Sequence, residues 1–130
     1  MSVIVDTNIL VRAIVQDHPE EAQRATALLA ANEVVIPVQT FCELIWVLAK
    51  VYKLSRAELI DVVSAWSDTE GVVVDTSAVA AGLAVLKSGG DFADGVVAFE
   101  GRRIGGSVFA TFDRRAVRIL SAAGHECMLV

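Results

Sequence analysis

The segment VIVDTNILVRAI, residues 3–14, sets the architecture of this chain. It begins with valine and isoleucine, which favour a buried strand, and this run ends directly at Asp6. Apolar side chains then recur at helical spacing, at Ile9, Leu10, Ala13 and Ile14. A strand that turns tightly into a helix is the repeating unit of α/β folds.

The same unit recurs along the chain. Short β-branched runs predict further strands at 34–36, 72–74, 108–110 and 128–130. Capping residues and apolar periodicity predict helices over 19–32, 41–52, 75–88, 91–105 and 114–122. A capping box at Ser55 and Glu58 predicts the start of one further helix. Alternating strands and helices indicate right-handed crossovers, so we expect a three-layer α/β/α fold with a parallel five-stranded sheet.

The composition is that of an ordinary globular domain. With 130 residues, 55% of them hydrophobic and 21% charged, the chain is expected to form one domain over residues 1–130. Cys42 and Cys127 lie far apart without a CxxC motif, so we expect free thiols in a reducing cytoplasm. Neither a signal peptide nor a run of about 20 apolar residues is present, which predicts a cytoplasmic protein without membrane contact.

Two aspartates directly follow predicted strands. Asp6 and Asp113 each come at the carboxyl end of a strand, where open α/β sheets bind their ligands. An aspartate at a strand-to-helix junction is also a good N-cap, and capping alone accounts equally well for each of them. Their shared position makes both residues candidates for a functional site.

Two further acids complete the candidate site. Glu43 is the only charged residue in FCELIWVLA, residues 41–49, and a carboxylate in an apolar environment is costly unless it is paired or binds a metal. A salt bridge to an arginine and an exposed strip of helix are the alternatives. In GGDFADG, residues 89–95, Asp91 is better placed as the helix cap and Asp94, in the first turn, as the functional acid.

The acids Asp6, Glu43, Asp94 and Asp113 together predict a metal site. If they converge, they repel one another until a cation neutralises them. Oxygen ligands without cysteine or histidine favour Mg²⁺ or Mn²⁺, which activates water for attack on phosphorus. A net charge of −5 opposes nucleic-acid binding, but arginines are concentrated in the last third of the chain. They are Arg102, Arg103, Arg114, Arg115 and Arg118. Backbone contacts to a nucleic acid and a solvated helix face account for them equally well.

Several segments resemble the PIN-domain family: VIVDTNIL at 3–10, FCELIWVL at 41–48, DFADGVVA at 91–98 and ATFDRRA at 110–116. The chain length, the DTNIL opening and the TFDRRA segment are similar to VapC toxins of bacterial toxin–antitoxin pairs. The resemblance covers essentially the whole chain. It implies a metal-dependent endoribonuclease whose acidic quartet falls on Asp6, Glu43, Asp94 and Asp113.

The resemblance also implies the surroundings of the site. The family's strand order, 3-2-1-4-5, brings Asp6 next to Asp113. Positions that orient the metal-binding carboxylates match Thr7, Asn8 and Thr111. Relatives form homodimers and are inhibited by a small antitoxin protein. Candidate anchors for such contacts are Trp46, Tyr52 and Trp66, with core packing as the alternative. Gly95 replaces the alanine that is more common in the family, which weakens its helix by up to about 1 kcal/mol.

Two other functions stay open on the sequence alone. An aspartate after a first strand is also the nucleophile of aspartate-based phosphotransferases, although those enzymes usually have a second aspartate where this chain has Asn8. A PIN fold also serves as a non-catalytic module that binds RNA or protein. The sequence has no GxxxxGK[ST] phosphate loop, no dinucleotide-binding glycine motif after a strand, and no nucleophile motif to pair with His18 or His125.

Overall fold

In the computed structural model, which describes residues 1–130, strand β1 (Ser2–Ile4) leads into helix α1 (Thr7–Val15), as residues 3–14 predict. All seven predicted helices and all five predicted strands are present. Contacts between the elements divide the chain into two parts, Met1–Asp75 and Thr76–Val130, which we call unit 1 and unit 2. No helix in either unit is long and apolar enough to cross a membrane.

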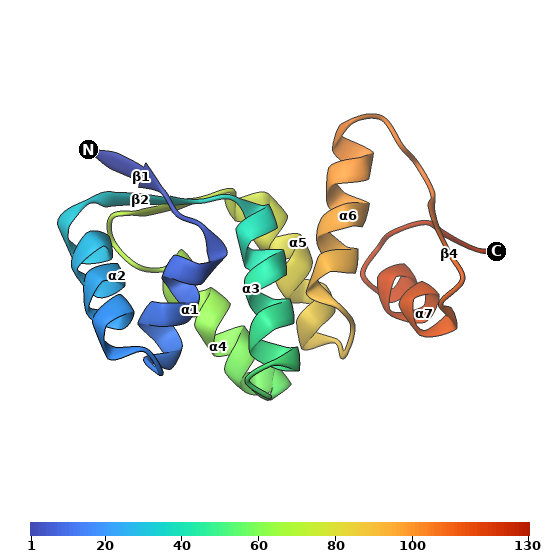
Figure 1. Cartoon of the computed structure of the whole chain (residues 1–130). Helices are drawn as coiled ribbons and strands as arrows, with labels where there is room; N and C mark the ends of the chain where they lie inside the picture. The colour runs from blue at the N-terminus through green and yellow to red at the C-terminus, as the bar shows by residue number, and fades with distance from the viewer. The chain divides into compact units, whose positions relative to one another are not determined.

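Unit 1 is a parallel sheet with its helices on one side. Its further elements are α2 (Pro19–Ala31), β2 (Glu33–Ile36), α3 (Val38–Lys50), α4 (Arg56–Ser67) and β3 (Val72–Val74). The strands lie in the order β1-β2-β3, and Figure 1 shows α1 to α4 on the same side of them. The core on that side includes the fully buried Leu10, Phe41 and Leu44. The predicted capping box of Ser55 and Glu58 starts α4.

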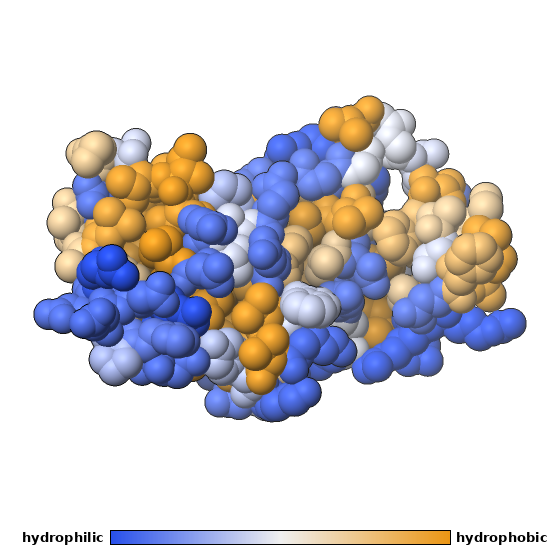
Figure 2. Space-filling view, viewed as in Figure 1, coloured by the Kyte–Doolittle hydropathy of each residue, from blue (hydrophilic) through white to orange (hydrophobic).

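The other face of this sheet carries an uncovered apolar row. Ile4 pairs with Val35 and Val35 pairs with Val73, so their side chains share one face. Ile4 is 76% exposed and Val73 is 48% exposed. Figure 2 shows a hydrophobic patch over β1 and β2. Parallel sheets are normally covered on both faces, so this row lacks the second helical layer of a three-layer fold.

Unit 2 consists of three helices and a two-stranded sheet. Its elements are α5 (Thr76–Lys87), α6 (Phe92–Arg103), β4 (Phe109–Thr111), α7 (Arg114–Ala122) and β5 (Cys127–Leu129). The two strands are parallel, with Phe109 opposite Cys127. Both of these residues pack on a buried cluster to which all three helices contribute. The cluster consists of Val85, Ala98, Ala116, Ile119 and Leu120.

The sheet differs from the expected one. In place of a single sheet with five strands in the order 3-2-1-4-5, the structure has two separate parallel sheets, β1-β2-β3 and β4-β5. Both partial orders agree with the expected order, but β1 does not pair with β4. Each of these strands has 3 residues. Pairing of two such short strands would add only a few hydrogen bonds, each with a net contribution of about 1 kcal/mol. A local sequence pattern does not specify this pairing.

Gly95 allows α5 and α6 to approach closely. A Cβ atom at position 95 would lie 2.6 Å from the carbonyl oxygen of Ala81 and 2.9 Å from Cγ2 of Val85. The neighbouring Gly82 is also crowded, because its Cβ would lie 2.5 Å from the ring of Phe92. The departure from alanine, expected to weaken α6, is therefore required by the packing of the two helices.

Gly95→Ala is expected to destabilise the protein, although alanine is the better helix former. The gain in helix propensity is about 1 kcal/mol, whereas overpacking costs about 1–3 kcal/mol and here involves a backbone oxygen that cannot rotate away. We therefore expect a net loss of about 1 kcal/mol in the free energy of unfolding. Gly101→Ala is the matched control in α6, since its Cβ would meet no atom within 4 Å, and it should stabilise the protein. Urea unfolding compares both variants, and stabilisation by Gly95→Ala would contradict this packing.

Candidate active site

Asp6 lies just beyond β1 and caps α1. Its carboxylate accepts a hydrogen bond from the Thr7 backbone N–H at 2.7 Å, which uses one oxygen, and the side chain is exposed. Capping is therefore confirmed for Asp6, and its second carboxylate oxygen is left for a ligand. The Thr40 hydroxyl, at the start of α3, donates a hydrogen bond to the Val5 carbonyl at 3.4 Å. This contact holds α3 against the chain segment that carries Asp6.

Glu43 lies on the exposed face of α3. The buried face of this helix is formed by Val38, Phe41, Leu44, Ile45 and Leu48. Glu43 falls outside that face, on the same strip as the exposed Trp46 and Lys50. The expectation of a carboxylate in an apolar environment is wrong, because the helical period separates Glu43 from its apolar sequence neighbours. Glu43 nevertheless follows Thr40 by about 4.5 Å along the helix axis, close to the contact with the end of β1.

Asp113 follows β4 and caps α7. One of its carboxylate oxygens accepts hydrogen bonds from the backbone N–H groups of Arg115 and Ala116, at 2.9 and 3.1 Å. Its own N–H donates to the Thr111 hydroxyl at 3.1 Å. Thr111 therefore fixes the backbone turn that presents Asp113, and capping is confirmed for this aspartate as well.

Asp94 is the most perturbed acid of the candidate site. Asp91 caps α6 by accepting a hydrogen bond from the Ala93 N–H at 3.2 Å, as predicted, and the half-buried Asp94 lies in the first turn of that helix. Burial raises the pKa of the Asp94 carboxyl, and the negative charges of Asp91 and Asp113 raise it further. These acids therefore lie within electrostatic reach of one another. Such a perturbed carboxyl is typical of metal-binding and catalytic acids.

The raised pKa of Asp94 predicts how the metal-free protein responds to pH. Because this pKa is higher in the folded chain than in the unfolded one, stability is lost as the pH rises through the folded pKa. Asp94→Asn removes that cost, so the variant should melt at a higher temperature than the unsubstituted protein at pH 7 in EDTA. The difference should disappear well below the ordinary aspartate pKa of about 3.9.

If Asp94 is a metal ligand, as the family resemblance implies, Mg²⁺ should reverse this order, because it would stabilise only the protein that keeps the carboxylate. Thermal melts at low and neutral pH, with EDTA or Mg²⁺, measure both effects. A lower melting temperature for Asp94→Asn in EDTA at pH 7 would show that the helix-capping benefit of an acid in the first turn outweighs the repulsion.

The donor chemistry of the acids fits a hard divalent cation. All of the candidate ligands are carboxylates, with no cysteine or histidine among them, and like charges help to raise the pKa of Asp94. Both features are typical of sites for Mg²⁺ or Mn²⁺. The structure does not assemble a complete ligand set, since no group of three or more His, Cys, Asp or Glu side chains is placed to hold an ion. Asp6 and Glu43 belong to unit 1, and Asp94 and Asp113 belong to unit 2. Each unit therefore contributes one pair of candidate ligands.

The arginines in the last third of the chain do not form one patch. Arg102 and Arg103 lie in the last turn of α6, and Asp94 lies in its first turn. The separation of Arg102 from Asp94 along the axis is about 12 Å. Arg114, in contrast, is exposed and directly follows Asp113. Arg114 is therefore the stronger candidate for contact with a phosphate near the acids.

Two other arginines have structural contacts. Arg103 forms an ion pair with Glu100 at 3.3 Å and lies 5.6 Å from the centre of the Phe99 ring. Arg115 donates a hydrogen bond to the Gly89 carbonyl at 2.6 Å, which connects α7 to the turn between α5 and α6. The bond of Arg115 therefore holds elements of unit 2 together, whereas both contacts of Arg103 lie within α6 itself.

The candidate aromatic anchors also differ from one another. Trp46 is 60% exposed on α3, whereas Trp66 is half-buried. Tyr52 donates a hydrogen bond to Asp17 at 3.0 Å and so belongs to an intramolecular network. Trp46 is therefore the one of the three whose side chain is largely accessible to a partner.

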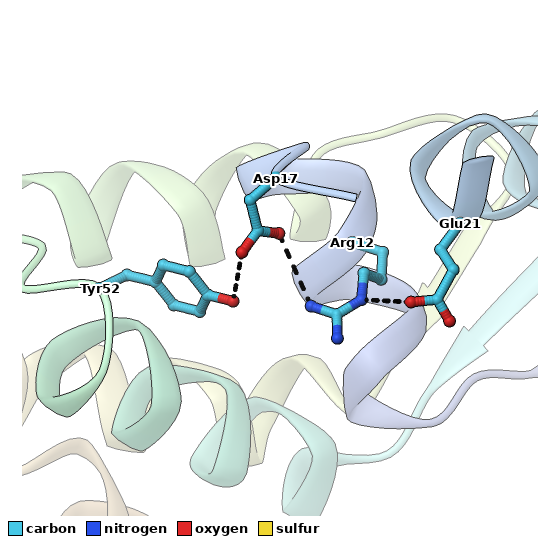
Figure 3. Close-up of polar contacts among 4 residues, drawn as sticks. All are labelled: Arg12, Asp17, Glu21 and Tyr52. Carbon is cyan, nitrogen blue, oxygen red and sulfur yellow. Dashed lines mark hydrogen bonds and ion pairs between the residues drawn. The ribbon is translucent and has the colours of Figure 1, made fainter. Parts of the chain in front are cut away.

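The network around Tyr52 was not predicted. Arg12 of α1 contacts Glu21 of α2 at 2.9 Å and Asp17 at 3.6 Å, and Asp17 in turn accepts the bond from Tyr52 (Figure 3). The hydrogen bond with Glu21 raises the pKa of Arg12. The network combines α1, α2, the turn between them and the segment that follows α3, and no local motif marks its residues. Three of the four residues are charged, and Tyr52 is the neutral member.

The chain belongs to the PIN-domain family, whose model matches residues 3–120. The match includes residues of both units and all of the candidate acids. PIN domains have an α/β fold, are generally nucleases that use divalent metals, and act on RNA or DNA. Comparison with curated proteins and with solved structures gave no match.

Proposed function

We propose that this chain is a Mg²⁺- or Mn²⁺-dependent endoribonuclease and the toxin of a toxin–antitoxin pair. The observation that carries the proposal is the placement of two acids, Asp6 and Asp113, where strands of a PIN domain end, together with the raised pKa of Asp94. The family's general activity supports hydrolysis of a phosphodiester. The further step to RNA and to a toxin rests on the segments that resemble VapC toxins.

The proposed site requires a single sheet in the order 3-2-1-4-5, formed by one domain over residues 1–130. With β1 next to β4, the carboxyl ends of the two strands meet at one edge, and Asp6 and Asp113 become neighbours. The right-handed crossover from β3 to β4 then brings α5 and α6 onto the open face of β1-β2-β3. The exposed apolar row on that face supports this arrangement, because it calls for a covering layer.

In this arrangement the residues Asp6, Glu43, Asp94 and Asp113 hold the cation. When bound, the cation neutralises charge on the phosphodiester and activates water for attack on phosphorus. Asp6 and Asp113 each use one carboxylate oxygen in a cap, so their orientation is set before any ligand arrives. Glu43 is free to turn toward the site because it is exposed. Arg114 provides a positive charge for the neighbouring phosphate.

The proposed partners follow from the same resemblance. They are an RNA substrate, a cognate small antitoxin that blocks access to the four acids, and a second copy of the chain, all in the cytoplasm. The exposed Trp46 lies on the same strip of α3 as Glu43, so a protein that covers this strip would contact both. Large exposed aromatic side chains are frequent anchors of protein interfaces.

The test is cleavage of a mixed RNA pool by the purified, antitoxin-free chain with Mg²⁺ or Mn²⁺. Fragments that appear with metal and disappear with EDTA support the proposal and map the cut sites. A folded chain that binds metal or RNA without cutting any RNA would instead be a non-catalytic PIN module. A phosphorylated aspartate trapped after incubation with a phosphate donor would indicate the aspartate-based phosphotransferase.

A further inference from the structure

A groove between α1 and α2 begins at Asn8, two residues after the candidate acid Asp6. Its volume is about 370 Å³, within the range of about 300–1,000 Å³ that small-ligand sites occupy. One wall is formed by Asn8, Ile9 and Arg12 of α1. The other is formed by Arg24, Ala25 and Leu28 of α2, together with Glu21, whose carboxylate is paired with Arg12. The groove therefore has room for one ring system and its substituents, but not for a folded segment.

We propose that this groove binds a single unpaired nucleobase of the RNA strand, next to the phosphodiester that is cleaved, with Arg24 over the face of the base. The inference rests on the proposed function, since it uses Asp6 as the marker of the cleavage site. It adds a base-binding subsite to that function. Neither the acids nor the arginines near Asp113 provide one.

The position of the groove supports this assignment. Its α1 wall begins at Asn8, two residues after Asp6, and ends at Arg12, four residues or about 6 Å further along the helix axis. This short separation along α1 leaves the groove within reach of a nucleotide adjacent to a phosphate held at Asp6. The face of α1 and α2 seen in Figure 2 is hydrophilic, in contrast to the hydrophobic patch over β1 and β2.

The lining matches the two surfaces of a base. Ala25 is buried and Ile9 and Leu28 are half-buried, so together they form an apolar floor for the flat face of a ring. Asn8 is exposed at the rim, where the polar edge of the base would lie, and Arg24 is exposed on the opposite wall, from which its guanidinium can cover the outer face of the ring. Unpaired bases in RNA are bound in this way, by stacking on apolar, aromatic or guanidinium surfaces combined with polar contacts at the edge.

Arg12 keeps the groove open at a fixed width. Its guanidinium is held by Glu21 at 2.9 Å and by Asp17 at 3.6 Å, and Tyr52 holds Asp17 from the other side (Figure 3). These contacts join α1, α2 and the end of α3, and they neutralise the charge of Arg12. A site that is organised before binding loses less entropy when the ligand enters.

Arg24 is the cation of the groove that is available for a ligand. It is exposed and forms no ion pair, whereas Arg12 is compensated by two carboxylates. A planar guanidinium can stack on a base and attract the adjacent phosphate at the same time. A protein helix would instead need a long groove with apolar pockets at helical spacing. The short floor of Ile9, Ala25 and Leu28 therefore favours a base over a peptide.

The test compares Arg24→Ala with Lys50→Ala, which removes one positive charge from the exposed end of α3. The substrate is a single-stranded oligonucleotide around a cut site mapped in the RNA pool, and the second substrate lacks the base next to that site. Arg24→Ala should lower kcat/KM about tenfold on the intact oligonucleotide and clearly less on the abasic one, where only the attraction to the phosphate is lost. Lys50→Ala should match the unsubstituted protein on both. Arg24→Lys should recover only part of the loss, because lysine keeps the charge without the plane.

Equal losses on the two substrates, no loss, or full recovery by lysine would overturn the base-binding subsite. If the unsubstituted chain cuts no RNA, the proposed function fails, and the groove is then tested by equilibrium binding of the same oligonucleotides without metal. Weaker binding of the intact oligonucleotide by Arg24→Ala than by Lys50→Ala would support base binding at the groove in a non-catalytic protein. Equal binding by the two variants would overturn it.

Discussion

Replacement of Asp94 by asparagine is expected to lower metal-dependent RNA cleavage by about a thousandfold. Asparagine keeps the shape of the side chain but removes the negative charge that a divalent cation requires. Transition-state stabilisation by a bound metal contributes several kcal/mol, and about 4 kcal/mol corresponds to a thousandfold in rate. The measurement is single-turnover cleavage of a mapped oligonucleotide at saturating Mg²⁺ and again at tenfold higher Mg²⁺, which shows how much of the loss is weaker metal binding.

Asp91→Asn is the matched control for this variant. The chemical change is the same and lies in the same helix, but Asp91 serves as the N-cap of α6, a role that asparagine fills as well as aspartate. We therefore expect its cleavage rate to stay within a few-fold of the unsubstituted protein. An equal loss of cleavage rate in both variants would mean that cleavage depends on the total negative charge at this end of α6. Asp94 would then not be a specific metal ligand. Full activity of Asp94→Asn would remove Asp94 from the site.

The secondary structure was predictable because its signals are local. The capping box of Ser55 and Glu58 and the cap at Asp91 are short patterns that compete with nothing else in the chain, and both start helices in the structure. Strands carry no caps, so their ends are less certain. The β4 strand begins at Phe109 instead of residue 108, and β5 begins at Cys127 instead of residue 128.

The lateral order of the strands was predictable only in part. The parallel pairs β1-β2, β2-β3 and β4-β5 agree with the order that the family resemblance implies. Pairing of β1 with β4 depends on contacts between segments more than a hundred residues apart, and nothing in VIV or FAT specifies a neighbour. Long-range pairing is determined by packing of side chains from many elements, which a local pattern does not contain.

The candidate site shows the same division. The positions of Asp6, Asp91 and Asp113 next to helices follow from capping, and the structure confirms a cap for each of them. The environment of Glu43 was not predictable from its immediate neighbours, because a helix places residues 41, 44 and 45 on the opposite side. The helical period, unlike adjacency in the sequence, places Glu43 on the same side of the helix as Trp46, and both side chains are exposed.

Ile4→Asp is expected to reduce the free energy of unfolding by about 3 kcal/mol or more. In the proposed three-layer domain, the row of Ile4, Val35 and Val73 lies beneath α5 and α6, so the variant places an unpaired charge in an apolar layer. If the row stays open to water, the same change costs less than about 1 kcal/mol, the range of strand preference alone. Urea unfolding followed by the fluorescence of Trp46 and Trp66 measures the difference.

Ile104→Asp makes the same chemical change at a side chain that is 87% exposed at the end of α6. Its only expected penalty is an acid near the negative end of the helix dipole, up to about 1 kcal/mol. A much larger loss for Ile4→Asp than for Ile104→Asp would therefore mean that a helical layer covers the sheet of unit 1. In the proposed domain this layer would include α6, which carries Asp94 in its first turn. Equal losses in the two variants would mean that no helical layer covers this sheet. The proposed metal site, which needs the acids of both units, would then be contradicted.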